Sequence, residues 1–153
     1  MKELRIGDHA PDFQGLNEKG EQLNLRDFAG KKLILFFYPK DNTPGCTAEA
    51  CSLRDSYQEL RDKNFELLGI SVDDAKKHSK FVAKYALPFP LIADTEQVMV
   101  NAYGVWGEKK FMGRVFDGIH RKTFVIDEKG VIERIFEKVN TSEHAEQILE
   151  SYL

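Results

Sequence analysis

Two cysteines, Cys46 and Cys51, are the residues of this chain best suited to chemistry, and the chain has no others. They follow its most apolar run, residues 33–38, and a Thr43-Pro44 pair lies just before Cys46. Threonine favours the capping position of a helix and proline its first helical position, so the pair predicts a helix that begins here. Cys46 then lies in the first turn, where unpaired N–H groups and the helix dipole favour the thiolate. The pattern predicts a reactive thiol.

Ionisation alone gives Cys46 a modest advantage. A thiol with an ordinary pKa of about 8.5 is about 3% ionised at pH 7, so full ionisation increases the thiolate roughly thirtyfold. Enzymes reach far larger accelerations, and a lower pKa also lowers nucleophilicity. A fast reaction therefore needs groups that orient the target and stabilise the transition state. The Thr43 hydroxyl, one turn before Cys46, is one candidate, and a cation from elsewhere in the chain is still required.

The five-residue spacing of the cysteines suits a switch better than a permanent crosslink. On an intact helix five residues rise roughly 7.5 Å, and the two Cα atoms lie about 8–9 Å apart on different faces. A disulfide needs a shorter separation. If Cys46 and Cys51 pair, the start of the helix must unwind.

Other interpretations of the two cysteines remain open on spacing alone. They could be an unreactive buried pair. A zinc site would need two further ligands, and the four histidines are scattered without helical pairing. These histidines are His9, His78, His120 and His144. A thioredoxin-type redox motif would require C-x-x-C, which the sequence lacks.

The elements that must position the thiol are those of a layered α/β domain. Residues 33–38 predict a central strand covered on both faces, because no polar residue interrupts them. Helical spacing of apolar residues continues from Thr43 to about residue 63. Further strands are expected at 22–25, 65–72 and 91–94, with a hairpin at 122–127 and 131–136. Further helices are expected at 73–85, at 96–103 and after a Thr141-Ser142 cap. The order predicts a mixed sheet with helices on both faces.

Residues 104–118 resist assignment and are interpreted as a long ordered loop, a kind of segment that is often functional. Within it, Trp106 and Phe111 are expected to anchor the loop or the core rather than to form a partner site.

The length, charge and cysteine count of the whole chain fit one cytosolic domain, residues 1–153. The net charge of −3 and the pI near 5.8 give no bias towards nucleic acid or an anionic membrane. No apolar run has the length of a membrane span, and the charged residues 1–5 lack the apolar core of a secretory signal. Two cysteines are too few for a disulfide scaffold, and in a reducing compartment such a pair is more often catalytic or metal-binding.

The residues around Cys46 resemble those of the peroxiredoxin family, specifically its bacterioferritin comigratory protein or peroxiredoxin Q subfamily. The family signature P-x3-[TS]-x2-C is matched by Pro39, Thr43 and Cys46, and Glu49 and Cys51 match subfamily positions. Similar segments run from residues 7–13 through 68–71 and 104–109 to 118–127. The resemblance implies a thioredoxin-like fold with a mixed central sheet, helices on both faces and N-terminal β additions.

The resemblance also implies roles for individual residues. Cys46 would attack the O–O bond, with Arg121 as the missing cation and Thr43 bonded to the sulfur and the substrate. Pro39 would shield the sulfenic acid, and Glu49 would orient the arginine. Cys51 would then condense with the sulfenate.

The activity implied is that of an atypical two-cysteine, thioredoxin-dependent peroxidase acting on hydrogen peroxide and organic hydroperoxides. A thioredoxin-like dithiol would regenerate it, with no cofactor, metal, nucleic acid or membrane, in a monomer or weak homodimer. Two alternatives share the same residues: a redox sensor or holdase chaperone, and a general disulfide reductase, which the missing C-x-x-C disfavours.

Overall fold

A five-stranded mixed sheet forms the centre of the structure, a computed structural model that describes residues 3–153. The strand order is β5-β4-β3-β8-β9, with β3 parallel to β4 and antiparallel to β8. The five strands are β3 Lys32–Phe37, β4 Phe65–Ser71, β5 Leu91–Ala93, β8 Lys122–Ile126 and β9 Ile132–Phe136. The predicted mixed sheet is confirmed, with β3 at its centre.

Alternation along β3 divides its side chains between two cores. Leu33, Leu35 and Phe37 contribute to the core on one face. Ile34, Phe36 and the following Tyr38 contribute to the core on the other. All six are at most 1% exposed, as expected for an uninterrupted apolar strand between two layers. The centre of the fold therefore follows directly from the apolar run.

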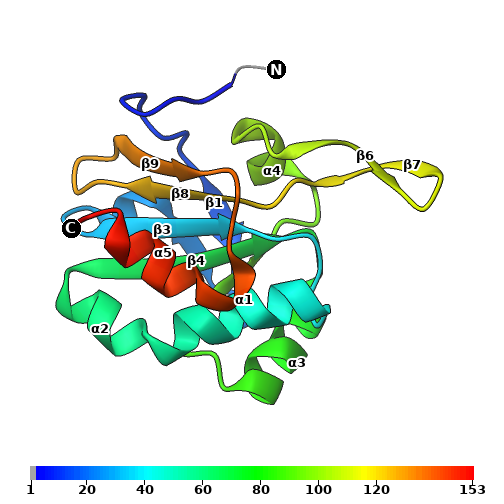
Figure 1. Ribbon diagram of the computed structural model, residues 1–153, viewed down its shortest axis with the longest axis horizontal. Coiled ribbons are helices and arrows are strands. Elements are labelled where there is room, and N and C mark those ends of the chain that lie inside the picture. The colour runs from blue at the N-terminus through cyan, green and yellow to red at the C-terminus, as the bar shows by residue number, and fades with distance from the viewer. Residues whose placement is uncertain (1–2) are drawn as a thin grey trace.

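The helices cover the two faces unequally (Figure 1). Four helices contribute to the core that contains Cys46, namely α1 Pro44–Asp55, α2 Tyr57–Asp62, α3 Ala75–Tyr85 and α5 His144–Glu150. The opposite face is covered by α4 Val98–Ala102 and by the N-terminal segment. Helices on both faces are thus confirmed, with the larger group beside the cysteines.

The N-terminal additions form a separate small hairpin attached to the main sheet. It consists of β1 Gln14–Leu16 and β2 Gln22–Asn24, followed by the 3-10 helix η1 Leu25–Phe28. Single bridges from His9 to Val131 and from Asn17 to Ile92 tie this region to the sheet. Residues 1 and 2, part of the charged N-terminus, lie outside the described residues. Within residues 3–153, no helix has the length and apolar character that crossing a bilayer requires.

Three local predictions were wrong. The expected helix from 43 to 63 is two helices, broken at Ser56, which has a backbone outside the helical region. Residues 104–118 are no loop but mostly a hairpin, β6 Trp106–Phe111 and β7 Arg114–Ile119. It projects from the body of the molecule in Figure 1, and Phe111 is 66% exposed rather than an anchor. Thr141 and Ser142 do not cap α5, because they lie inside a 3-10 turn, η2 Thr141–Glu143.

Candidate active site

Cys46 is the third residue of α1, and the connection from β3 places it there. Thr43 occupies the N-cap with extended backbone, and Pro44 is the first helical residue, as predicted. The Cys46 side chain is 2% exposed and belongs to the core formed by β3 and the large helical layer. A thiol this deeply buried needs a charged or hydrogen-bonding partner before its anion is stable.

Arg121 is that partner, and it reaches Cys46 from 75 positions away in the sequence. It lies between β7 and β8, and its Nη2–H group donates to Cys46 Sγ at 3.3 Å. Its Nη1–H group donates to Glu49 Oε1 at 2.6 Å. One planar guanidinium thus contacts both the thiol and a carboxylate, a geometry that lysine could not supply. The structure brings together three of the predicted site residues.

Glu49 is a fully buried carboxyl group on α1, one turn after Cys46. Its exposure is 0%, and the ion pair with Arg121 satisfies only Oε1. Burial raises the pKa of Glu49 from 4.5 to about 7, although the charge of Arg121 and its hydrogen bond act in the opposite direction. Glu49 therefore fixes the guanidinium and is itself close to titrating at neutral pH.

Gly45 makes room for the arginine. A Cβ atom at this position would lie 3.1 Å from Arg121 Nη2, closer than most real contacts of such an atom. The glycine therefore permits the close approach of the guanidinium to the first turn of α1. It is a site residue that sequence reasoning missed, although Gly45 precedes Cys46 directly.

Lys109 is a second cation near the sulfur that sequence reasoning missed. It lies on β6, and its Nζ donates to the carbonyl oxygen of Ile119 at 2.8 Å. Burial lowers the pKa of Lys109, the charge of Arg121 lowers it further, and the nearby Cys46 acts in the opposite direction. The prediction of a loop at residues 104–118 gave no reason to expect Lys109 near Cys46, because it is the pairing of the hairpin strands that brings Lys109 to the site.

Thr43 and Pro39 lie in the connection that precedes α1. The Thr43 hydroxyl donates to the carbonyl oxygen of Lys40 at 2.9 Å. Across residues 3–153 no hydrogen bond joins Thr43 to the Cys46 sulfur. Pro39 is half-buried. Both residues are next to the site, and the roles implied for them remain predictions.

Cys51 lies on the same unbroken helix as Cys46, and both thiols are free. It is half-buried, whereas Cys46 is buried. Ser52, the next residue, accepts a hydrogen bond from the backbone N–H of Ala145 in α5 at 3.1 Å. The intact helix is the arrangement expected of a dithiol form in which α1 must open before the sulfurs meet.

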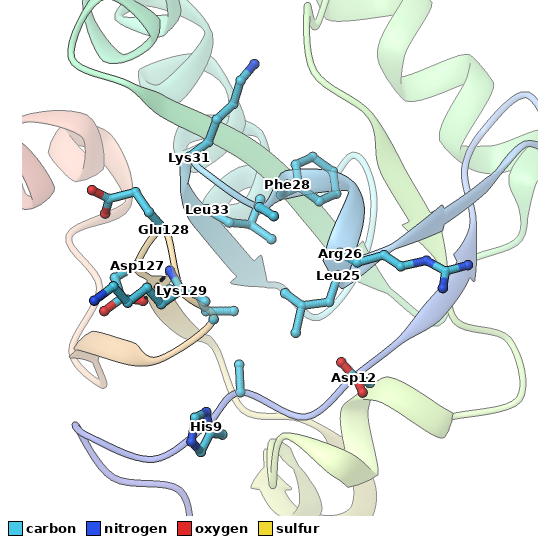
Figure 2. Close-up of a pocket in the computed structure, with 14 residues that line it drawn as sticks. His9, Asp12, Leu25, Arg26, Phe28, Lys31, Leu33, Asp127, Glu128 and Lys129 are labelled. Carbon is cyan, nitrogen blue, oxygen red and sulfur yellow. Dashed lines mark hydrogen bonds between the residues drawn. The ribbon is translucent and has the colours of Figure 1, made fainter.

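A cavity of about 530 Å³ is lined by other residues than those of this thiol site. Figure 2 shows the side chains that line it. Its lining includes Leu33 at the start of β3 and Ile126 at the end of β8, whereas Cys46 follows the other end of β3. Asp12, Arg26 and Asp127 give it mixed charge. None of the predicted site residues lines it.

Asp41, Asp73 and His78 form the one cluster of potential metal ligands found in the described part of the chain. Most of their polar atoms already form hydrogen bonds with other protein groups. His78 Nδ1 lies 2.6 Å from Asp41 Oδ2, and His78 Nε2 lies 2.9 Å from the carbonyl oxygen of Ile92. Asp73 Oδ2 accepts the backbone N–H of Asp41 at 2.8 Å and the Ser71 hydroxyl at 2.8 Å. These hydrogen bonds join Asp41, in the segment that leads into α1, to His78 of α3 and to Asp73 just after β4.

Comparison with known proteins agrees with the geometry of the thiol. The family model described as AhpC/TSA family matches residues 6–135. This chain belongs to that family. It is 46% identical to Peroxiredoxin Bcp of Escherichia coli (strain K12) over 149 residues, covering 97% of this chain and 96% of the relative. It is 40% identical to Peroxiredoxin Bcp of Bacillus subtilis (strain 168) over 148 residues, covering 97% and 94%.

Solved structures that resemble this chain are also peroxiredoxins. A Xanthomonas campestris Peroxiredoxin Q structure superposes with a TM-score of 0.85 at 34% identity, covering 91% of this chain and 88% of the other. A Xylella fastidiosa PrxQ mutant superposes with a TM-score of 0.91 at 30% identity, covering 99% and 97%. The thioredoxin-like fold and the peroxiredoxin resemblance are confirmed. The chain is a thiol-dependent peroxidase of the atypical two-cysteine type.

Proposed function

We propose that residues 1–153 act as one peroxiredoxin domain in which Cys46 reacts with hydrogen peroxide and organic hydroperoxides. The observation that carries the proposal is the contact between Arg121 and Cys46 at 3.3 Å on a buried helix start. The Xanthomonas campestris bacterioferritin comigratory protein, a solved relative, has alkyl peroxide reduction activity, which supports organic hydroperoxides as substrates.

In the first step the Cys46 thiolate attacks one oxygen of the peroxide and the O–O bond breaks. Sulfur becomes sulfenic acid, and the leaving alkoxide or hydroxide takes up a proton. Arg121 stabilises the thiolate and the negative charge that develops on the leaving oxygen. Thr43 turns from its Lys40 partner towards the substrate, and Pro39 limits access of water.

In the second step the sulfenic acid condenses with the Cys51 thiol, with loss of water, to give an intramolecular disulfide. The start of α1 unwinds for this, because the two sulfurs lie on different faces of the intact helix. A thioredoxin-like dithiol then reduces the disulfide by exchange. We expect the protein to act in the cytoplasm, as a monomer or weak homodimer.

Peroxide consumption coupled to a thioredoxin system tests this proposal. Wild type should turn over, and Cys46→Ser should not. Cys51→Ser should consume about one equivalent of peroxide and then stop, because its sulfenic acid has no internal thiol. Turnover by Cys46→Ser would refute the assignment. A non-enzymatic sensor on the same fold would be oxidised once, without sustained coupling to thioredoxin.

A further inference from the structure

Four exposed lysines line a second cavity, of about 320 Å³, and none of the predicted site residues lines it. Three of the lysines come from α3, and one comes from the segment between β3 and α1. They are Lys40, Lys77, Lys80 and Lys84. A cavity of this size is in the range that holds a small ligand.

The three α3 lysines share one face of that helix. Positions 77, 80 and 84 are separated by three and then four residues, so their side chains lie on the same side. Like charges at this spacing destabilise a helix. A helix face that concentrates cations beside a cavity therefore gains from an anion that balances them.

The protein itself supplies little of that balance. Within residues 3–153, none of the four lysines forms an ion pair with an acidic side chain. Lys84 Nζ instead donates to Asn42 Oδ1 at 3.2 Å, and the Tyr85 hydroxyl donates to the same oxygen at 3.2 Å. Asn42 lies in the same segment as Lys40, so these hydrogen bonds join the two sides of the cavity before a ligand binds.

Two carboxylates also line the cavity, Asp41 and Asp73, and both are less than a tenth exposed. His78 Nε2 lies 2.9 Å from the carbonyl oxygen of Ile92, which can only accept, so Nε2 carries a hydrogen. Two acceptors would repel each other at 2.6 Å, so a further proton lies between His78 Nδ1 and Asp41 Oδ2 and leaves this pair without net charge. Asp73 Oδ2 accepts the Ser71 hydroxyl and the backbone N–H of Asp41. Four cations thus face one uncompensated carboxylate.

The lining favours recognition by charge rather than by stacking. Phe81 is its one apolar side chain, and a ring that is 2% exposed offers no open face to an aromatic base. Lysine ammonium groups bind phosphate oxygens as compact point charges. One phosphate group carries a charge of about −1.5 to −2 at pH 7, so four lysines fit a ligand that has two of them.

We propose that this cavity binds a small anion with two phosphate groups, held between α3 and the segment that leads into α1. Lys77, Lys80 and Lys84 donate to it from one side and Lys40 from the other. The inference goes beyond the proposed function, because binding involves no step of peroxide reduction. The site nevertheless adjoins the thiol helix, since the carbonyl oxygen of Lys40 accepts the hydroxyl of the N-cap residue Thr43.

Isothermal titration calorimetry of the reduced protein with pyrophosphate tests the site. Four exposed ion pairs predict a dissociation constant of about 1 mM at low ionic strength. Lys80→Gln and Lys40→Gln should each weaken binding about fivefold, whereas Lys80→Arg keeps the charge and should stay within about twofold of wild type. Lys76→Gln is the matched control, because Lys76 is exposed on α3 but does not line the cavity. Its binding should also stay within about twofold of wild type.

ADP carries the same diphosphate group on a nucleoside and is the second probe. Equal binding of ADP and pyrophosphate supports a nucleotide as the source of the diphosphate, and binding of pyrophosphate alone supports the inorganic anion. Equal weakening by Lys76→Gln and Lys80→Gln would show only general attraction to α3 and would overturn the inference. Full binding in Lys40→Gln would also overturn it, because the ligand would then not reach both sides of the cavity.

An acidic protein surface is the other class of occupant that lysines attract. Absence of saturable pyrophosphate binding at about 10 mM, ten times the expected constant, would overturn the inference. A higher KM for the thioredoxin-like reductant in Lys80→Gln, together with that absence, would identify the lysines as a protein docking surface instead.

Discussion

The opening of α1 can be tuned by one substitution between the cysteines, Ala48→Gly. Glycine in a helix interior costs about 1 kcal/mol relative to alanine, and Ala48 lies on α1 between Cys46 and Cys51. If disulfide formation requires unwinding, a loss of about 1 kcal/mol of helix stability multiplies the open fraction about fivefold. The first oxidation should not change, because the folded form still dominates.

Quenched-flow alkylation and mass spectrometry would follow sulfenic acid, disulfide and sulfinic acid after peroxide is added. Ala48→Gly should form the Cys46–Cys51 disulfide about fivefold faster and need about fivefold more peroxide for half over-oxidation. Ala83→Gly is the matched control, because Ala83 lies on α3. An unchanged disulfide rate in Ala48→Gly, or an equal increase in Ala83→Gly, would refute the unwinding step.

Three further predictions concern the site itself. Arg121→Gln should slow Cys46 oxidation by about 10²–10³-fold in rapid mixing, whereas Arg134→Gln, whose arginine donates to the Ser151 carbonyl, should not. Gly45→Ala should displace the Arg121 guanidinium and slow the same step about tenfold, while Gly107→Ala, with an ordinary 3.6 Å contact, should have no effect. Because burial raises the pKa of Glu49 from 4.5 to about 7, the stability from its protonation is present below pH 4.5 and lost as pH rises through 7. Urea unfolding of wild type should therefore lose about 3 kcal/mol relative to Glu49→Gln between pH 4.5 and 7.

Local signals were enough to predict the strand, the turn and the start of the thiol helix. Thr43 and Pro44 set the helix start because capping and proline geometry depend on adjacent residues alone. The uninterrupted apolar run predicted β3 for the same reason. The break at Ser56 has no such signal, since neither proline nor glycine lies there.

The projecting hairpin was missed because its pattern contradicts the usual signals. Its turn is Met112-Gly113, with φ of 51° and 79°, rather than the asparagine-glycine pair typical of such turns. Its apolar side chains Phe111, Val115 and Phe116 are exposed, so no alternation between core and solvent marks the strands. Contacts between residues far apart in the sequence also leave no local pattern. Only the family resemblance therefore connected Arg121 with Cys46.

Glu49 has two opposed effects on α1. Its pairing with Arg121 holds the helix closed, and its buried, unsatisfied oxygen favours opening. Before reaction, the hydrogen bonds from Arg121 to Glu49 and to Cys46 hold the start of α1 closed. After reaction the sulfur is a sulfenic acid and no longer carries a charge, while Glu49 Oε2 is still buried and unsatisfied. Returning the carboxylate to water then favours opening. The Ser52–Ala145 hydrogen bond and the buried Leu53 anchor the rest of α1, which confines unwinding to the turns that carry the two cysteines.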